Sequence, residues 1–129
     1  MPRLKTETFG AGDQSWLGSA HGIANARTES IDVSAFTAGT HYPNGYIPSG
    51  FPVALVGGLL VPYDITTGTT TGAGILAGHV LTDQPVVGTA DFAVPVLDHG
   101  RVKVAKIATI LTGFVKPLAA KNATTIVYI

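Results

Sequence analysis

The chain has 129 residues and a mass of 13.2 kDa, which is the size of one domain. Eight basic residues balance eight acidic ones, and only 12% of the residues are charged, about half the usual share. Apolar residues make up 46% of the chain, which excludes an intrinsically disordered protein, and the zero net charge argues against a general nucleic-acid binder. A weakly charged, near-neutral surface instead favours association.

The sequence contains no cysteine, which excludes disulfides, thiolate metal sites and cysteine nucleophiles. Its first residues lack the apolar segment of a secretory signal, so we expect no signal peptide. The longest uncharged stretch, residues 33–63, is long enough to span a bilayer, but it contains four prolines and five glycines. A continuous apolar helix does not tolerate that composition, so we predict no transmembrane segment.

In chain order, the first feature is an N-terminal segment without periodicity. Residues 1–26 contain four glycines and only scattered large apolar residues. This composition predicts a flexible N-terminal arm, followed by a single β-rich domain over residues 27–129.

Strand signals begin at residues 29–36, where apolar and polar residues alternate. The pair Asn44-Gly45, flanked by tyrosines, then predicts a tight turn. Residues 51–61 form an apolar run interrupted by Gly57-Gly58. This run indicates two short buried strands joined at a Gly-Gly turn.

The second half of the chain repeats this strand-and-turn pattern. We expect an exposed Thr/Gly loop at 66–72, a strand within 73–82, a hairpin that pairs 92–97 with 102–105, and a last strand at 124–129. Helical spacing occurs once, in the apolar residues between Ile107 and Phe114. The predicted fold class is therefore mainly β, with short strands and hairpins and one short helix near 105–113.

Charges are segregated along the sequence. Residues 64–98 hold four acids and no bases, whereas residues 101–129 hold five bases and no acids. In one interpretation, two sides of the fold simply differ in sign. In the other, an acidic edge of one copy meets a basic edge of its neighbour, which would set the register of an assembly.

Motifs for catalysis or metal binding are weak. The four histidines fall in different predicted elements, without metal-ligand spacing. Asp98-His99 resembles a base with its orienting carboxylate, but no nucleophile elbow, phosphate loop or acid pair accompanies it. We therefore expect no catalytic, cofactor-binding or metal-binding residue. Trp16, Tyr42 and Tyr46 could serve as carbohydrate platforms, although aromatic residues are only 8% of the chain.

Three short motifs, taken in order, resemble a known family. They are G-L-L-V-P-Y-D at 58–64, G-A-G-I-L-A-G at 72–78 and H-G-R-V at 99–102. With this order the chain resembles the lambda-type decoration protein D family of tailed-bacteriophage heads. The segment T-F-G-A-G-D-Q-S-W-L-G at 8–18 resembles the arm of a branch found in actinobacterial phages and prophages. Residues 38–51 are longer than in the lambda-type protein, which indicates an insertion.

The resemblance implies a non-enzymatic capsid decoration protein on the outer surface of the virion. Its partners would be the major capsid protein and two further copies of itself, with no nucleic acid and no membrane. Such a trimer sits at three-fold and quasi-three-fold positions of the expanded head and clamps neighbouring shell subunits. We assign capsid contact to the arm, especially Phe9, Trp16 and Leu17, because large aromatic anchors dominate interface energies. The alternative for Trp16 is that it covers the core of its own domain.

Two other functions remain open at this point. The first is another β-rich virion component, such as a tail or head-fibre base protein, which would bind elsewhere on the particle. The second is a small ligand-binding barrel or enzyme that uses Asp98, His99 and a hydroxyl group. It requires a concave polar pocket that holds these side chains.

Overall fold

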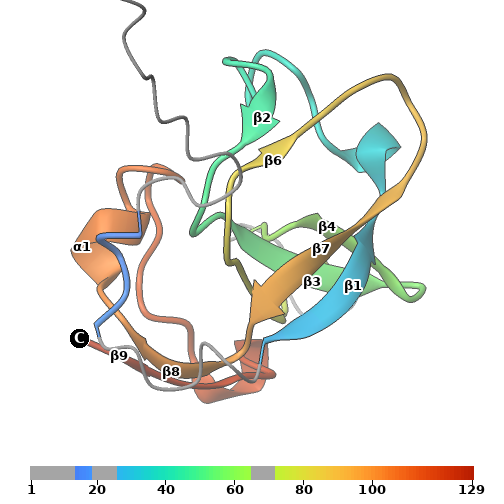
Figure 1. Cartoon of the computed structure of the whole chain (residues 1–129). Helices are drawn as coiled ribbons and strands as arrows, with labels where there is room; N and C mark the ends of the chain where they lie inside the picture. Colours follow the sequence, from blue (N-terminus) through green and yellow to red (C-terminus); the bar gives the residue numbers. More distant parts are fainter. Residues whose placement is uncertain (1–13, 19–25, 65–71) are drawn as a thin grey trace, which may run out of the picture.

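The computed structural model describes residues 14–18, 26–64 and 72–129. The expected arm, apart from residues 14–18 and Ala26, and the expected loop, apart from Gly72, lie outside these ranges. Within them the chain is mainly β, as predicted (Figure 1). The strands are β1 (Arg27–Ile31), β2 (Tyr46–Ile47), β3 (Pro52–Val56), β4 (Leu59–Pro62), β5 (Gly78–Val80), β6 (Gln84–Pro85), β7 (Phe92–Leu97), β8 (His99–Val102) and β9 (Thr125–Tyr128). None of the helices in the described ranges is long and apolar enough to cross a membrane.

Five strands close into a small barrel in the order β1-β4-β3-β5-β7. Strands β3 and β4 form the predicted hairpin, and Leu55 pairs with Leu60. Its turn is Gly57-Gly58, with φ angles of +61° and +83°. Two successive positive φ angles characterise the two-residue turn that matches strand twist, and glycine adopts them without steric cost. The Gly-Gly pair therefore sets the register of this hairpin.

The first predicted strand is shorter than expected. β1 ends at Ile31, and the chain then turns into the 3-10 helix η2 (Val33–Ala35). The Asp32 side chain accepts a hydrogen bond from the Ser34 backbone N–H, which caps this helix. The carboxylate of Asp91 accepts a second one, from the Val33 N–H at 3.0 Å. These two acids turn the chain at the end of β1.

The expected hairpin between 92–97 and 102–105 is wrong. Strand β7 pairs with β1 and β5, whereas β8 pairs in parallel with the C-terminal strand β9. The other edge of β8 is occupied by the N-terminal segment. There the Gly18 N–H donates to the Arg101 carbonyl, and the Lys103 N–H donates to the Trp16 carbonyl, both at 2.8 Å. One neighbour of β8 thus comes from the start of the described chain and the other from its end.

One short α-helix, α1 (Val104–Ile107), lies within the described ranges, at the start of the region where a helix was expected. Turns follow it as far as Phe114, whose N–H donates to the Leu111 carbonyl. The Thr109 hydroxyl donates to the Lys106 carbonyl at 2.6 Å. Such side-chain hydrogen bonds compete with the helical backbone pattern, and the helix ends near this residue. A further 3-10 turn, η3 (Ala119–Lys121), precedes β9.

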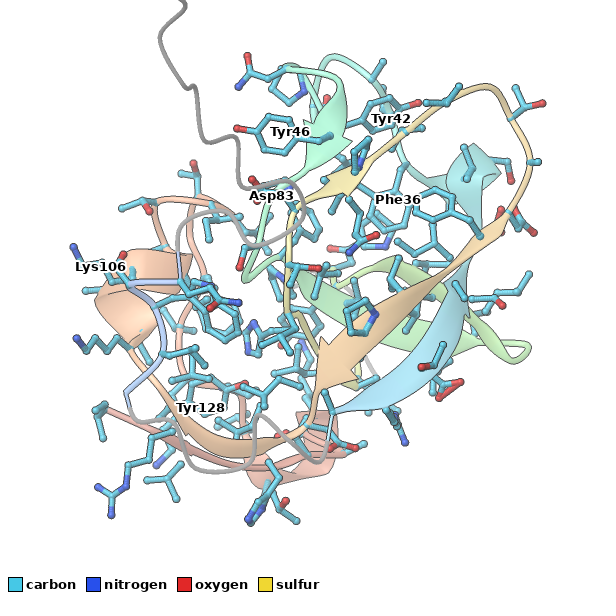
Figure 2. All side chains as sticks on the ribbon, in the orientation of Figure 1. Phe36, Tyr42, Tyr46, Asp83, Lys106 and Tyr128 are labelled. Carbon is cyan, nitrogen blue, oxygen red and sulfur yellow. The ribbon has the colours of Figure 1, made fainter. Side chains whose placement is uncertain are left out.

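The apolar side chains form two clusters (Figure 2). One fills the barrel and contains Ile31, Val33, Phe36, Ile47, Phe51, Val53, Leu60, Val80, Val94 and Val96. The other lies between the barrel and the unit made by β8, α1 and β9, and it contains Trp16, Tyr63, Leu76, Leu81, Leu97, Val102, Ile107, Phe114, Ile126 and Tyr128. The second cluster joins the two parts of the fold into one domain.

Candidate functional site

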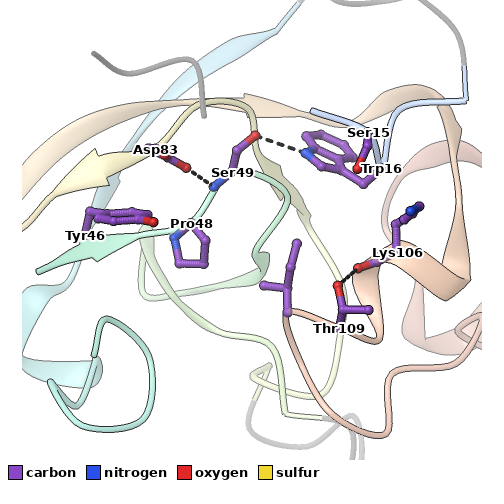
Figure 3. A pocket seen from close by; sticks show the side chains of 9 residues that line it. Ser15, Trp16, Tyr46, Pro48, Ser49, Asp83, Lys106 and Thr109 are labelled. Carbon is purple, nitrogen blue, oxygen red and sulfur yellow. Dashed lines mark hydrogen bonds between the residues drawn. The ribbon is translucent and has the colours of Figure 1, made fainter. Parts of the chain in front are cut away.

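A small crevice of about 190 Å³ lies where the N-terminal segment, α1 and the loop around residue 48 meet (Figure 3). Polar side chains contribute much of its wall. The lining residues are Ser15, Trp16, Tyr46, Pro48, Ser49, Asp83, Lys106, Thr109 and Ile110. The crevice thus brings together residues that are up to 95 positions apart in the sequence (Ser15 and Ile110).

Trp16 forms the floor of this region and is only 1% exposed. Its indole N–H donates to the Ser49 hydroxyl at 3.0 Å, and that hydroxyl donates to the Leu81 carbonyl at 2.7 Å. The Asp83 carboxylate accepts a hydrogen bond from the Ser49 N–H at 2.7 Å (Figure 3). Gln14 adds a bond from its side-chain amide to the Leu81 carbonyl at 2.8 Å. Segment 14–18 is therefore anchored to the domain by a buried ring and a chain of hydrogen bonds.

Behind Trp16 lies a fully buried histidine, His79. Its Nδ1 lies 2.9 Å from the Gly50 carbonyl, and its Nε2 lies 2.8 Å from the Tyr128 hydroxyl. Because a carbonyl can only accept, Nδ1 carries the hydrogen, and Nε2 accepts the phenol hydrogen. Burial lowers the pKa of His79 to about 4, although the bond to the Gly50 carbonyl opposes this. The imidazole is consequently neutral and structural at neutral pH.

The rings of Trp16, Phe114 and Tyr128 surround this imidazole, with centroids 5.7–5.9 Å from its own. Burial raises the pKa of the Tyr128 phenol, so the phenol keeps its hydrogen at physiological pH. Nothing local in the sequence predicts this network. The one available signal is that His79 interrupts an apolar run at residues 75–81, which is typical of a buried position.

The structure gives the three predicted contact residues different positions. Phe9 lies outside the described residues. Trp16 belongs to the core, which is the alternative considered for it, and an indole with 1% exposure offers no surface to a shell. Leu17 is half-buried and forms a β-bridge to Val102.

Asp98 and His99 are not part of the crevice. Asp98 lies 3.4 Å from the Arg27 guanidinium, and His99 Nδ1 lies 2.8 Å from the Thr125 hydroxyl on β9. In the described ranges, no three histidine, aspartate or glutamate side chains are grouped as metal ligands. Of the three aromatic residues considered as carbohydrate platforms, Trp16 and Tyr46 both line the crevice, but Trp16 is only 1% exposed.

The acidic stretch of the sequence does not form one edge. The Asp83 carboxylate accepts a hydrogen bond from the Ser49 N–H at the crevice, and the Asp91 carboxylate accepts one from the Val33 N–H at the start of η2. Asp98 forms an ion pair with Arg27. Asp64 lines a separate groove. Acids that are close in sequence are therefore distributed over different parts of the domain.

That groove is larger, about 630 Å³, and mostly apolar. Its described lining residues are Ala35, His41, Val56, Val61, Pro62, Tyr63, Asp64, Ala73, Leu111 and Thr112. A second apolar surface lies on β9 and the residue after it, where Val127 is 53% and Ile129 is 56% exposed. These two features and the crevice are the main candidate contact sites on the described part of the chain.

Comparisons with protein-family models, with curated proteins and with solved structures give no match to this chain.

Proposed function

We propose that this chain is a capsid decoration protein that binds the outside of an expanded phage head as a trimer and clamps neighbouring shell subunits. The resemblance of its ordered motifs to the lambda-type family motivates the proposal. The structural observation that carries it is the anchoring of segment 14–18. An N-terminal arm can hold a shell only if its base is fixed to the domain, and here the base is buried.

The anchor explains how a load on the arm would reach the domain. Residues 16–18 lie along β8 through the hydrogen bonds of Gly18 and Lys103, and the Trp16 ring lies under the crevice. Pulling the segment out would break these bonds and expose a large aromatic ring. Exposing such a ring costs about 3 kcal/mol. A contact made by residues before Gln14 would therefore be transmitted into the core.

This assigns separate roles to the three predicted contact residues. Phe9 belongs to the proposed shell-binding part, Leu17 lies at the transition to the domain, and Trp16 is the internal anchor. Deleting residues 1–20 would remove the anchor together with the arm and would test folding and binding at once. A deletion of residues 1–13 separates the two.

The test uses undecorated, expanded heads of the phage or prophage that encodes the chain. We expect the full chain to co-sediment with these heads and the chain without residues 1–13 to lose most of that binding. The deleted chain should keep the thermal unfolding midpoint of the full chain because Trp16 remains in place. A point variant, Phe9→Ser, provides a milder version of the same comparison.

Cryo-electron microscopy of decorated heads then tests the location. Density at three-fold and quasi-three-fold positions agrees with the proposal, whereas density only at the tail or at fibres favours another virion component. A full chain that binds no part of the particle contradicts the proposal.

A further inference from the structure

The crevice over Trp16 presents polar groups from three separate elements to one small hollow. Tyr46 comes from β2, Asp83 from the loop between β5 and β6, and Lys106 from α1. Figure 3 shows Tyr46 and Asp83 on one side of the crevice and Lys106 on the other. Tyr46 belongs to neither apolar cluster, so its ring is not part of the core. The crevice therefore has polar groups and an aromatic ring that the fold itself does not require.

The Asp83 carboxylate is a fixed hydrogen-bond acceptor in this crevice. Its Oδ1 atom accepts the Ser49 N–H at 2.7 Å, which holds the half-buried side chain in place. A carboxylate has several further lone pairs, so it can also accept hydrogen bonds from a ligand. Hydrogen bonds to an ionised acceptor are about twice as strong as neutral ones. A ligand with hydroxyl donors would gain most from this group.

One acid and one base leave the crevice without net charge. Asp83 and Lys106 form no ion pair with each other or with any other described residue. Lys106 is exposed, so solvent screens its attraction for an anion, but its ammonium group still donates hydrogen bonds. The Tyr46 hydroxyl can both donate and accept. This set of groups favours an uncharged, hydroxyl-rich ligand over a phosphate, which Asp83 would repel, or a polyamine, which Lys106 would repel.

The size of the crevice and the rest of its wall limit the ligand to one small ring. Its volume of about 190 Å³ is below the roughly 300–1,000 Å³ of pockets that bind drug-sized molecules. The Tyr46 ring, Pro48 and Ile110 add apolar surface beside the polar groups. A hexose has both properties, because hydroxyl groups surround its edge and C–H groups form an apolar face. A tyrosine, with an apolar body and a polar tip, suits such a ring.

We infer that the crevice binds one hexose unit of an uncharged carbohydrate. The apolar face of the sugar packs against Tyr46, its hydroxyl groups donate to the Asp83 carboxylate, and the Lys106 ammonium donates to another sugar oxygen. The Trp16 ring forms the floor, so its fluorescence reports occupancy. This binding activity goes beyond capsid decoration and belongs to the isolated domain.

The experiment titrates the full chain with the methyl glycosides of glucose, galactose and mannose, whose anomeric carbon is blocked as it is within a glycan. Proton–nitrogen NMR spectra and Trp16 fluorescence follow the titration. We expect at least one glycoside to shift the signals of the Ser49 amide and the Trp16 indole in a saturable way. A Kd of about 1 mM is expected for a ligand with so few atoms.

Three variants test the assigned contacts. Asp83→Asn keeps an oxygen that can accept the Ser49 N–H but loses the charge, and Tyr46→Ser removes the ring. Each should weaken binding by about tenfold or more. The matched control is Asp91→Asn, because Asp91 also accepts one backbone N–H, that of Val33, but does not line the crevice. This control should bind like the wild-type chain, and unfolding midpoints verify that all three variants fold.

Four outcomes overturn the inference. They are the absence of any shift at glycoside concentrations up to about 50 mM, far above the expected Kd, shifts confined to residues outside the crevice, equal affinity of the wild-type, Asp83→Asn and Tyr46→Ser chains, and tighter binding of glycine or phosphate than of any glycoside. None of these outcomes is the failure of the proposed function, which is measured separately as binding of the wild-type chain to heads.

Discussion

The Nε2 atom of His79 on β5 lies 2.8 Å from the hydroxyl oxygen of Tyr128 on β9, inside the core. This bond joins a barrel strand to the C-terminal strand. On the opposite side of the ring, Nδ1 bonds to the Gly50 carbonyl, and Trp16 packs beside it. Barrel, C-terminal unit and N-terminal anchor thus meet at one neutral imidazole, and all four predictions below concern it or the residues around it.

We first predict that stability decreases as the pH falls from about 6.5 to about 4. His79 has a pKa of about 4 in the folded chain, against 6.5 for an unperturbed histidine. Between these pH values the unfolded state binds one more proton than the folded state, so the free energy of unfolding rises with pH. The contribution of His79 to this free energy is fully present above about pH 6.5. The contribution lost by pH 4 is on the order of 3 kcal/mol. Urea unfolding at several pH values measures it.

The control is the same series on His79→Gln, in which this part of the pH dependence should be absent. If that variant does not fold, an NMR titration of His79 in the wild-type chain decides the question. A ring that titrates near 6.5 in the folded protein would contradict the prediction.

The second prediction concerns Tyr128→Phe. This change removes the only described donor to His79 Nε2 and leaves a buried acceptor without its hydrogen bond, which costs about 1–3 kcal/mol. Long-range proton–nitrogen NMR spectra of the wild-type chain should show the neutral tautomer with hydrogen on Nδ1. A spectrum with hydrogen on Nε2 would contradict the assigned network. Denaturant unfolding of the variant gives the energetic cost.

The features that local sequence predicted correctly are those that short-range chemistry determines. Gly57-Gly58 permits the backbone angles of the β3–β4 turn. The signal for the last strand is its run of β-branched and aromatic residues, and the alternate burial, with Ile126 and Tyr128 buried and Val127 exposed, is a feature of the structure. Both signals lie within a few neighbouring residues. The mainly β class follows from many such signals along the chain.

The features that sequence analysis missed depend on partners far away in the chain. The segment at 92–97 has a suitable partner nearby at 102–105, but β8 instead pairs with β9 and with residues 16–18. Trp16 lies in a segment without periodicity, so no local pattern predicts that its side chain is buried. The residues that contact its ring, Ser49 and His79, come 33 and 63 residues later in the chain. Likewise, the segregated charges left a single acidic edge as one of two interpretations, and Asp83, Asp91 and Asp98 instead contact Ser49, Val33 and Arg27.

The third prediction tests the anchor. Ser49→Ala leaves the buried Trp16 N–H without its acceptor, and it should lower the free energy of unfolding by about 1–3 kcal/mol. Trp16→Phe removes the donor as well as part of the ring, so in that background Ser49→Ala should cost much less. A double-mutant cycle by urea unfolding measures this coupling. Equal costs of Ser49→Ala in both backgrounds would show that the hydrogen bond does not hold the segment.

The last prediction compares two glycines with similar backbones but different surroundings. Gly50 has φ +91° and Gly45 has φ +86°, so alanine is strained at both positions, by about 1–2 kcal/mol. A Cβ atom on Gly45 meets nothing within 4 Å, whereas one on Gly50 would lie 2.8 Å from the Trp16 ring. Because that ring is buried, it can move only by disturbing the core around His79. We therefore expect Gly50→Ala to cost at least about 2 kcal/mol more than Gly45→Ala in thermal or urea unfolding.

The fluorescence of Trp16, the only tryptophan in the chain, should shift in Gly50→Ala alone. Equal costs and unchanged fluorescence in both variants would mean that Trp16 does not lie against Gly50.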